Sequence, residues 1–405
     1  MKKGFLSEYF EGVGVKRLSK VDADPKSSNQ HEIGTTREMR AFLGENHQEP
    51  FETTYVWLGG DQEGFSVEAT ATHYDSRRNK ADRSPEWRLY YTTNPVTAMM
   101  SEGDTLFLAK RQNGQLMFIV VPAAVSLETQ LLWLFGFDSQ PGFKFAAQSY
   151  EGSNDAELDF TARFVLDELG IEFEDPNANS IDNIIEHFGL QFPKTVEFSD
   201  LARLTVPEVD AYNDPDHALM AWLDHEEAMF RRLERRIVSD RVQRGFVEND
   251  EVDVDGFLSF SLSVQNRRKS RMGHSFENHL SAVFDAWSIP YKRGGITERN
   301  NKPDFLFPGI EAYRDPAFPD NQLSMLAAKS VCKERWRQIL PEADRINSKH
   351  LATLEPAIST AQTDQMKAHN VRLVVPNSIQ ASYSVEQRKW LWNMQHFIEH
   401  VKSKG

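Results

Sequence analysis

The sequence of 405 residues contains a single cysteine, Cys332, and no long apolar run. One cysteine excludes a disulfide framework and a zinc site built from cysteines. No stretch approaches the roughly 18–20 apolar residues that span a bilayer. The first apolar residues are interrupted by Ser7 and Glu8, which argues against a signal peptide. Gly294 and Gly295 stand alone, without the spacing of a phosphate-binding loop. We therefore expect a cytoplasmic protein with no membrane partner.

The sequence also lacks an excess of positive charge. It has 46 Lys and Arg against 60 Asp and Glu, a net charge of −14, which by itself argues against a nucleic-acid partner. Most of the excess is local, because residues 151–210 hold fifteen acidic and three basic residues, a net −12. Turn formers cluster at 174–180. These features predict an inter-domain linker region over 151–195, with short helices at 158–169 and 181–188; an acidic surface subdomain is the alternative.

The first 150 residues have a β-rich pattern. Short apolar runs are separated by turn signals, of which Asn113-Gly114 is the strongest. Many short strands at this spacing are typical of a barrel or a sandwich. The expected strands are 53–58, 65–72, 87–92, 105–110 and 117–122. Residues 1–150 are therefore predicted to form a β-barrel-like domain.

Residues 196–405 have a mixed α/β pattern. Asp214-Pro215 is a helix-start signal, followed by a periodic apolar face. Short apolar runs of the kind found in strands covered by helices follow later. The expected helices after the first are 275–287, 333–348 and 385–401, and the expected strands are 304–308, 325–330 and 371–376. The arginines of the first helix are predicted to form a solvated face.

Two carboxylates and a lysine are spaced along the α/β part. Asp304 opens a predicted strand, Lys329 lies inside the next one, and Glu342 follows thirteen residues later. A lysine within an apolar strand is costly unless it has a partner or a function. Carboxylate oxygens suit Mg²⁺, which assists phosphodiester hydrolysis, and a nearby lysine offsets the developing negative charge. A strand-edge turn residue and a snorkelling lysine are the structural alternatives.

A charged triplet follows Lys329 directly. Lys333 and Arg335 have the donors that recognise guanine, and Glu334 accepts from the cytosine amino group. The triplet therefore predicts recognition of G·C pairs in the major groove, with a solvated helix start as the alternative.

A second basic cluster precedes the predicted helix at 275. With its glycine and serines it is expected to form a loop that contacts phosphates. Its basic residues are Arg267, Arg268, Lys269 and Arg271.

Several of these stretches resemble, in the same order along the chain, the EcoRII-type restriction endonucleases. They are residues 263–280, 301–308, 326–340, 342–344, 350–354 and 371–376. The resemblance, which spans about residues 200–376, implies a PD-(D/E)xK restriction-endonuclease-like fold for the C-terminal domain. It implies a catalytic set of Glu277, Asp304, Lys329 and Glu342, in which Asp304 and Glu342 bind Mg²⁺. It also implies that the triplet at 333–335 recognises the CC and GG pairs of the site.

The N-terminal part is less similar to the same family. The stretches 15–19, 30–34, 75–78 and 83–88 resemble its effector domain, a DNA-binding pseudobarrel. The resemblance implies DNA contacts from His31, Glu32, Arg77, Arg83, Glu86, Trp87 and Arg88. The spacing between Arg83 and Glu86 departs from the family pattern.

Together these features predict a multi-domain α+β chain. The resemblance implies a homodimeric type II restriction endonuclease that cuts double-stranded DNA at a CC…GG site with Mg²⁺. It implies that a second copy of the site, bound by the N-terminal domain, relieves autoinhibition, and that a DNA methyltransferase is the genetic partner. A DNA-binding protein without catalysis and a structure-specific repair nuclease remain as alternatives. An intact catalytic set argues against the first, and substitution of Arg335 discriminates the second.

Overall fold

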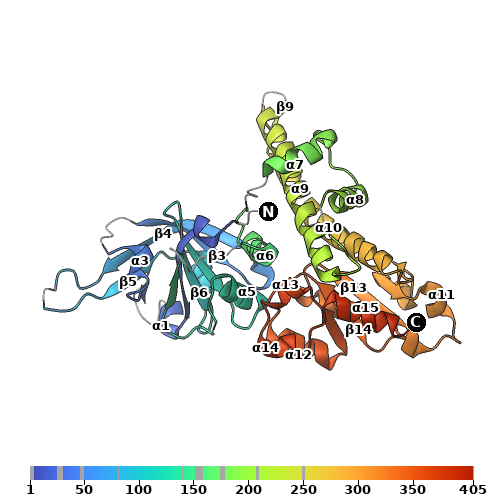
Figure 1. Cartoon of the computed structure of the whole chain (residues 1–405). Coiled ribbons are helices and arrows are strands. Elements are labelled where there is room, and N and C mark those ends of the chain that lie inside the picture. The colour runs from blue at the N-terminus through green and yellow to red at the C-terminus, as the bar shows by residue number, and fades with distance from the viewer. Residues whose placement is uncertain are drawn as a thin grey trace. The chain divides into compact units, whose positions relative to one another are not determined.

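The computed structural model describes residues 4–24, 31–45, 50–80, 82–138, 140–150, 158–173, 178–206, 209–248 and 251–404 (Figure 1). The chain divides into two compact units. The N-terminal unit comprises Lys2–Glu174 and Ala357–Ser359, and the C-terminal unit comprises Asp175–Pro356 and Thr360–Gly405. The predicted linker region 151–195 is thus divided between the two units.

The N-terminal unit contains one eight-stranded sheet in the order β2-β5-β4-β3-β7-β6-β1-β8. Neighbouring strands are antiparallel, except that β3 and β7 are parallel. Strands β2 and β8 lie at the two edges, so the sheet is open, as in a pseudobarrel, and the β-rich prediction is confirmed. The strands are β1 Phe10–Arg17, β2 Glu32–Gly34, β3 Phe51–Trp57, β4 Phe65–Asp75, β5 Trp87–Tyr91, β6 Thr105–Arg111, β7 Leu116–Val121 and β8 Ala146–Ser149.

Both faces of this sheet are buried along its strands β1, β6 and β7. Successive residues of a strand point to opposite faces, and in β7 Phe118 belongs to one core cluster whereas Ile119 belongs to the other. Helices α1 Lys20–Ala23, α3 Arg40–Leu43 and α4 Pro95–Met99 contribute to the first cluster, and α5 Ser126–Leu134 and α6 Phe160–Glu168 to the second. The predicted helix at 158–169 is therefore part of the N-terminal core. The 3-10 helices are η1 Leu6–Glu8 and η2 Gly60–Gln62.

The C-terminal unit contains a five-stranded mixed sheet in the order β11-β12-β13-β14-β15. Strands β11 to β13 are antiparallel, and β13 to β15 are parallel. The α/β prediction is confirmed. The strands are β11 Lys292–Arg293, β12 Phe305–Phe307, β13 Ser324–Lys329, β14 Lys349–Thr353 and β15 Val371–Val374.

Two long helices, α9 and α10, form a hairpin that extends from this sheet (Figure 1). Asp214 caps α9 and Pro215 is its first residue, as the sequence predicted. A short ribbon of β9 Val247–Glu248 and β10 Glu251–Val252 joins the two helices. The helices of the unit are α7 Ala178–Ile185, α8 Thr195–Thr205, α9 Pro215–Arg244, α10 Val254–Ala286, α11 Ile310–Arg314, α12 Thr360–Ala368, α13 Asn377–Gln380, α14 Val385–Arg388 and α15 Met394–Lys402, with 3-10 helices η4 Glu186–Phe188, η5 Glu298–Asn300, η6 Asp320–Gln322 and η7 Lys333–Ile339.

Three predicted boundaries in this unit are wrong. Helix α10 begins at Val254 rather than at 275, so the basic cluster lies within a helix. The helix expected over 333–348 is only the 3-10 helix η7, because Pro341 lacks the N–H that would continue it, and β14 follows. The helix expected over 385–401 is divided into α14 and α15. Across the described parts of the chain, no helix has both the length and the apolar character needed to cross a membrane.

Candidate active site

Asp304 and Lys329 meet at one edge of the C-terminal sheet. Asp304 immediately precedes β12, and Lys329 is the last residue of the antiparallel neighbour β13, so strand pairing brings the two together. The Lys329 Nζ lies 2.9 Å from Asp304 Oδ2. The same carboxylate oxygen accepts the backbone N–H of Ala328 at 2.7 Å. Each partner therefore holds the other in a defined orientation.

Glu342 completes the cluster from the turn after η7. The residue is half-buried, and its buried Oε2 has no hydrogen-bond partner within the described structure. Burial and then the charge of Asp304 raise the pKa of Glu342 to about 7, against the opposing charges of Lys329 and Lys349. An orphaned carboxylate oxygen beside a second carboxylate is the arrangement that a cation would stabilise.

Lys349 holds the turn that carries Glu342. Its side chain is buried, and its Nζ donates to the carbonyl oxygens of Glu342 at 2.6 Å, Ala343 at 3.2 Å and Ile346 at 2.9 Å. Burial lowers the pKa of Lys349. Lys349 was not among the residues predicted from the sequence. Its place at the start of the apolar run KHLAT is the pattern that could have pointed to it.

The donor set suits a hard divalent cation. Asp304 and Glu342 supply carboxylate oxygens, which Mg²⁺ prefers, and neither a thiolate nor an imidazole belongs to the cluster. Over the described residues, no group of three or more His, Cys, Asp or Glu side chains is arranged to hold a metal ion. Further ligands would therefore come from water and from phosphate oxygens, as is usual for Mg²⁺.

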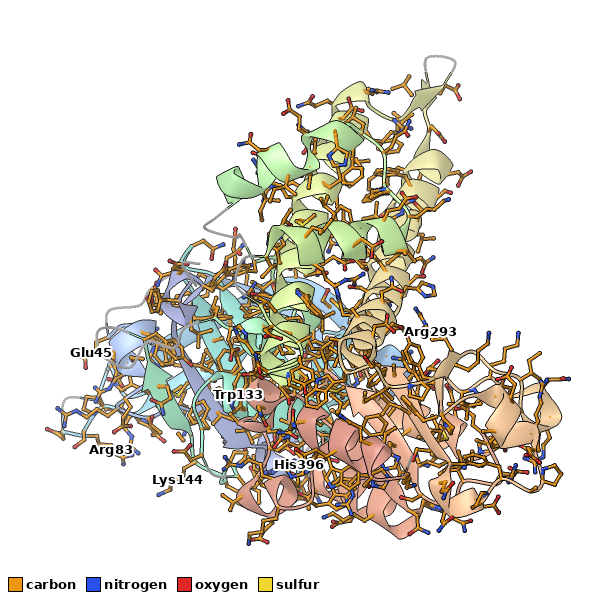
Figure 2. All side chains as sticks on the ribbon, turned by 45° about the vertical axis from the view of Figure 1, so that its right-hand side comes forward. Glu45, Arg83, Trp133, Lys144, Arg293 and His396 are labelled. Atoms are coloured by element: carbon orange, nitrogen blue, oxygen red, sulfur yellow. The ribbon has the colours of Figure 1, made fainter. Side chains whose placement is uncertain are left out.

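Glu277 lies on α10 and pairs with an arginine of β11. Its Oε2 accepts from Arg293 at 2.7 Å, and Arg293 also donates to Asn278 Oδ1 at 3.0 Å. Arg293, labelled in Figure 2, lies opposite Phe305 in the β11–β12 pair, one residue after Asp304. Among the described contacts, the ionic partner of Glu277 is thus Arg293, and not a member of the Asp304 cluster.

The recognition segment, residues 333–335, begins four residues after Lys329 and forms the first turn of η7. The Arg335 side chain is exposed and donates to the carbonyl of Val331. Lys333 is half-buried. The side chain of Glu334 lies outside the described part of the structure. The backbone thus places this segment just beyond the edge that carries Lys329.

The basic cluster lies on α10 and not in the predicted phosphate-binding loop. Its arginines contact acidic or aromatic residues of the same unit. Arg271 is buried and donates to Glu226 and, at 2.7 Å, to Glu227. The remaining arginines are also engaged: Arg268 donates to Glu234 at 2.7 Å, and the Arg267 guanidinium lies 4.1 Å from the ring centre of Phe192. Lys269 is exposed.

His279 extends this buried network. Arg203 lies 3.0 Å from its Nδ1, and Glu226 lies 2.8 Å from its Nε2. Because arginine only donates, Nδ1 accepts and the proton is on Nε2, which donates to Glu226. Burial lowers the pKa of His279 despite the opposing effect of Glu226. Burial alone would raise the pKa of Glu226, but His279 and Arg271 outweigh it, and the net shift is downward.

The candidate residues of the N-terminal unit lie at β2, on β5 and in the connection between β4 and β5. Arg88 pairs with Glu32 at 2.7 Å and with Glu86 at 3.0 Å, and Arg77 pairs with Glu86 at 2.8 Å. Arg83 is exposed in the connection between β4 and β5, where it is labelled in Figure 2. The two aromatic candidates pack onto neighbouring rings. The ring centres of Trp87 and His73 are stacked 4.9 Å apart, and those of His31 and Tyr91 are 5.4 Å apart, edge to face.

The sequence matches a known family over the C-terminal unit. Residues 230–398, which include Glu277, Asp304, Lys329 and Glu342, match the family model described as EcoRII C terminal. The type II restriction enzyme EcoRII of Escherichia coli is 39% identical over 230 residues, 56% of this chain and 55% of that protein. The chain thus covers about half the length of this relative.

Solved structures give weaker likenesses. A metal-depleted Ecl18kI in complex with uncleaved DNA aligns with 56% of this chain and 84% of its own, at 16% identity and a TM-score of 0.45. A complex of restriction endonuclease PspGI with substrate DNA aligns with 57% and 95%, at 14% identity and a TM-score of 0.38.

Proposed function

We propose that the chain is a type II restriction endonuclease that cleaves double-stranded DNA, because residues 230–398 match the EcoRII C-terminal family model and the restriction enzyme EcoRII is 39% identical over 230 residues. The observation that carries the proposal is the cluster of Asp304, Lys329 and Glu342 at one sheet edge, within the matched segment. A lysine and a carboxylate at the ends of neighbouring strands, with a second carboxylate from a nearby turn, suit phosphodiester hydrolysis.

We assign catalytic roles to the residues of this cluster, and their geometry supports the assignment. Bound Mg²⁺ supplies positive charge at the phosphoryl oxygen and lowers the pKa of a bound water. Asp304 and Glu342 would hold the cation, and Lys349 fixes the turn on which Glu342 is carried. The Lys329 ammonium, oriented by Asp304, orients the attacking water and stabilises charge on the phosphorane-like transition state. Glu277 supports this edge through Arg293.

Specificity is assigned to the recognition segment. Lys333 and Arg335 donate to guanine and Glu334 accepts from cytosine, so that the enzyme selects a short CC…GG site. Cleavage before the first C leaves 5′ overhangs. The N-terminal unit binds a second copy of the site through the candidate residues at β2, on β5 and in the β4–β5 connection, and this effector DNA shifts the chain from an inhibited to an active state. The protein acts in the cytoplasm, with a DNA methyltransferase as its genetic partner.

Cutting both strands of a pseudo-palindromic site calls for two copies of the active site. We assign the contact to the first half of α10, whose exposed apolar residues follow helical spacing. They are Val254, Phe257, Leu258 and Leu262. Acidic Glu251 and Asp253 precede this face, and basic Arg267 and Lys269 follow it. Antiparallel pairing with α10 of a second copy would place opposite charges together.

Light scattering tests this dimer. The double substitution Leu258→Glu, Leu262→Glu should yield monomers, whereas Leu204→Glu, a control at an exposed leucine of α8, should leave the dimer intact. A dimeric double variant would contradict the assignment.

Digestion of a plasmid of known sequence tests the function itself. With Mg²⁺ the purified chain should cut at CC…GG sites, and sequencing of the ends should show cleavage before the first C. Chelation of the cation should abolish the reaction, and short cognate duplexes should accelerate it. A plasmid left intact with Mg²⁺ and effector duplex would overturn the proposal.

A further inference from the structure

A buried carboxylate lies behind the recognition segment. Strands β13 and β14 are parallel neighbours, with Lys329 paired to Thr353, so their carboxyl ends meet at the same edge. Glu355 follows β14 by two residues and its side chain is almost completely buried, at 1% exposure. Glu355 was not among the residues predicted from the sequence.

Glu355 binds the backbone where the recognition segment begins. Its Oε2 accepts the N–H groups of Cys332 at 2.6 Å and of Lys333 at 2.7 Å. These are charge-assisted bonds to an ionisable acceptor, which are stronger than bonds between neutral groups. A single buried oxygen thus fixes two consecutive peptide units.

The bound backbone has an uncommon conformation. Lys333 has a φ of +39°, in the left-handed region that residues other than glycine seldom adopt. Such a conformation persists only when the surrounding structure imposes it. The two bonds to Glu355 hold the peptide units on either side of this turn, at the point where η7 leaves the sheet edge.

Glu355 is itself held in place on both sides. Its own N–H donates to the Thr353 hydroxyl at 3.2 Å, and its carbonyl oxygen accepts from the Tyr383 hydroxyl at 2.6 Å. The carboxylate therefore has a fixed position relative to β14, and through the β13–β14 pair relative to Lys329.

We propose that Glu355 is a positioning residue for specificity, which holds residues 333–335 in register with Lys329 so that base recognition and cleavage occur on the same bound DNA. The inference rests on the proposed function, since it assumes that these residues contact bases. It adds a residue that touches neither base nor phosphate and acts through the backbone of Cys332 and Lys333.

Asp216 offers a matched control. It is also a buried carboxylate of the C-terminal unit, and it accepts backbone N–H groups from Asn377 at 3.2 Å, Met394 at 3.1 Å and Gln395 at 3.3 Å. Its bonds hold the starts of α13 and α15 rather than the recognition segment. Asp216→Asn therefore reports the loss of a buried carboxylate with no effect on residues 333–335.

The test compares Glu355→Ala, Glu355→Gln and Asp216→Asn in the full chain. For each protein, kcat and KM are measured with Mg²⁺ on a duplex that contains the site and on a duplex with one G·C pair changed, together with the melting temperature. Glu355→Ala should reduce the cognate preference about tenfold or more, the size of one lost base contact. Glu355→Gln should retain most of it, because an amide oxygen still accepts both N–H groups.

The control separates positioning from folding. Asp216→Asn should lower the melting temperature and leave the cognate preference unchanged. If Glu355→Ala lowers the melting temperature but keeps the wild-type preference, the inference is overturned and the proposed function stands. If the wild type cleaves neither duplex, the proposed function fails and the inference fails with it.

Discussion

Two basic regions of the C-terminal unit differ in what their positive charges contact. Four of the five residues at 267–271 are basic, yet Arg268 and Arg271 form ion pairs with acidic residues of α9. Lys329 stands alone in an apolar strand, yet it lies between two carboxylates at a sheet edge. The difference shows that the position of a cation in the fold, rather than its density in the sequence, decides whether it is available for chemistry.

Asp304→Asn should give the largest effect. It removes a proposed cation ligand and the acceptor for Lys329, so cleavage should fall about 10³-fold or more, since the cation supplies several kcal/mol of transition-state stabilisation. The fold should persist, because the residue is partly exposed at the sheet edge. Single-turnover cleavage and calorimetric titration with Mg²⁺ measure both consequences. Unchanged cation affinity would contradict the assignment.

Arg271→Met should affect the other region in a different way. It leaves Glu226 buried without its cation, which costs about 3–5 kcal/mol of unfolding free energy. Cleavage per folded molecule should be unchanged. Urea denaturation measures the loss, and Lys269→Met, exposed on the same helix, should stay within about 0.5 kcal/mol of the wild type. A large fall in DNA affinity without loss of stability would restore the cluster to a DNA-binding role.

Lys349→Met tests whether the turn at the sheet edge needs its buried cation. Three carbonyl oxygens would lose their donor, and Glu342 would be held less firmly. Groups that orient metal ligands are worth about 10–100-fold in affinity or activity, so we expect a loss of that size in Mg²⁺ affinity. Titration calorimetry measures it, and an unchanged affinity would show that the turn is rigid without Lys349.

A smaller effect comes from pH, through one buried histidine in each region. Burial lowers the pKa of His279, and burial lowers that of His350 to about 3. The unfolded chain protonates both near pH 6.5, so it binds more protons than the folded chain below that pH. Stability is therefore full above about pH 7 and falls on acidification.

Each histidine contributes up to about 1.4 kcal/mol per pH unit below 6.5. His350→Phe keeps the ring beside Trp392 and loses the titration, so its decline in stability between about pH 7 and about pH 5 should be shallower than that of the wild type. Denaturation by urea at both pH values measures the slopes. Equal slopes would mean that His350 is not held neutral.

The cluster itself could be anticipated because strand pairing is a strong constraint. Asp304 was expected to open one strand and Lys329 to lie inside the next, and the antiparallel β12–β13 pair brings them together. Glu342 was expected on a helix but lies in a turn, because Pro341 and the start of β14 end η7 early. The role proposed for Glu342 does not depend on that error.

Other features depend on tertiary packing that local patterns do not encode. Strand β1 was missed because Gly12 and Gly14 weaken its signal, and the glycines are there because a Cβ at either position would collide with Phe42 or Met39. The ion pair of Arg271 could not be predicted locally, because its partner Glu226 lies 45 residues away on another helix. Glu355 and Lys349 act on backbone groups, and nothing in their neighbouring sequence indicates those targets.

One measurement tests the central contrast most directly. Lys329→Met keeps the length of the side chain and removes its charge. We expect its single-turnover cleavage rate with Mg²⁺ to fall at least about 10²-fold, while its affinity for the same duplex stays close to that of the wild type. A cleavage rate equal to the wild type would show that this lone lysine does not take part in the chemistry, and would contradict the account.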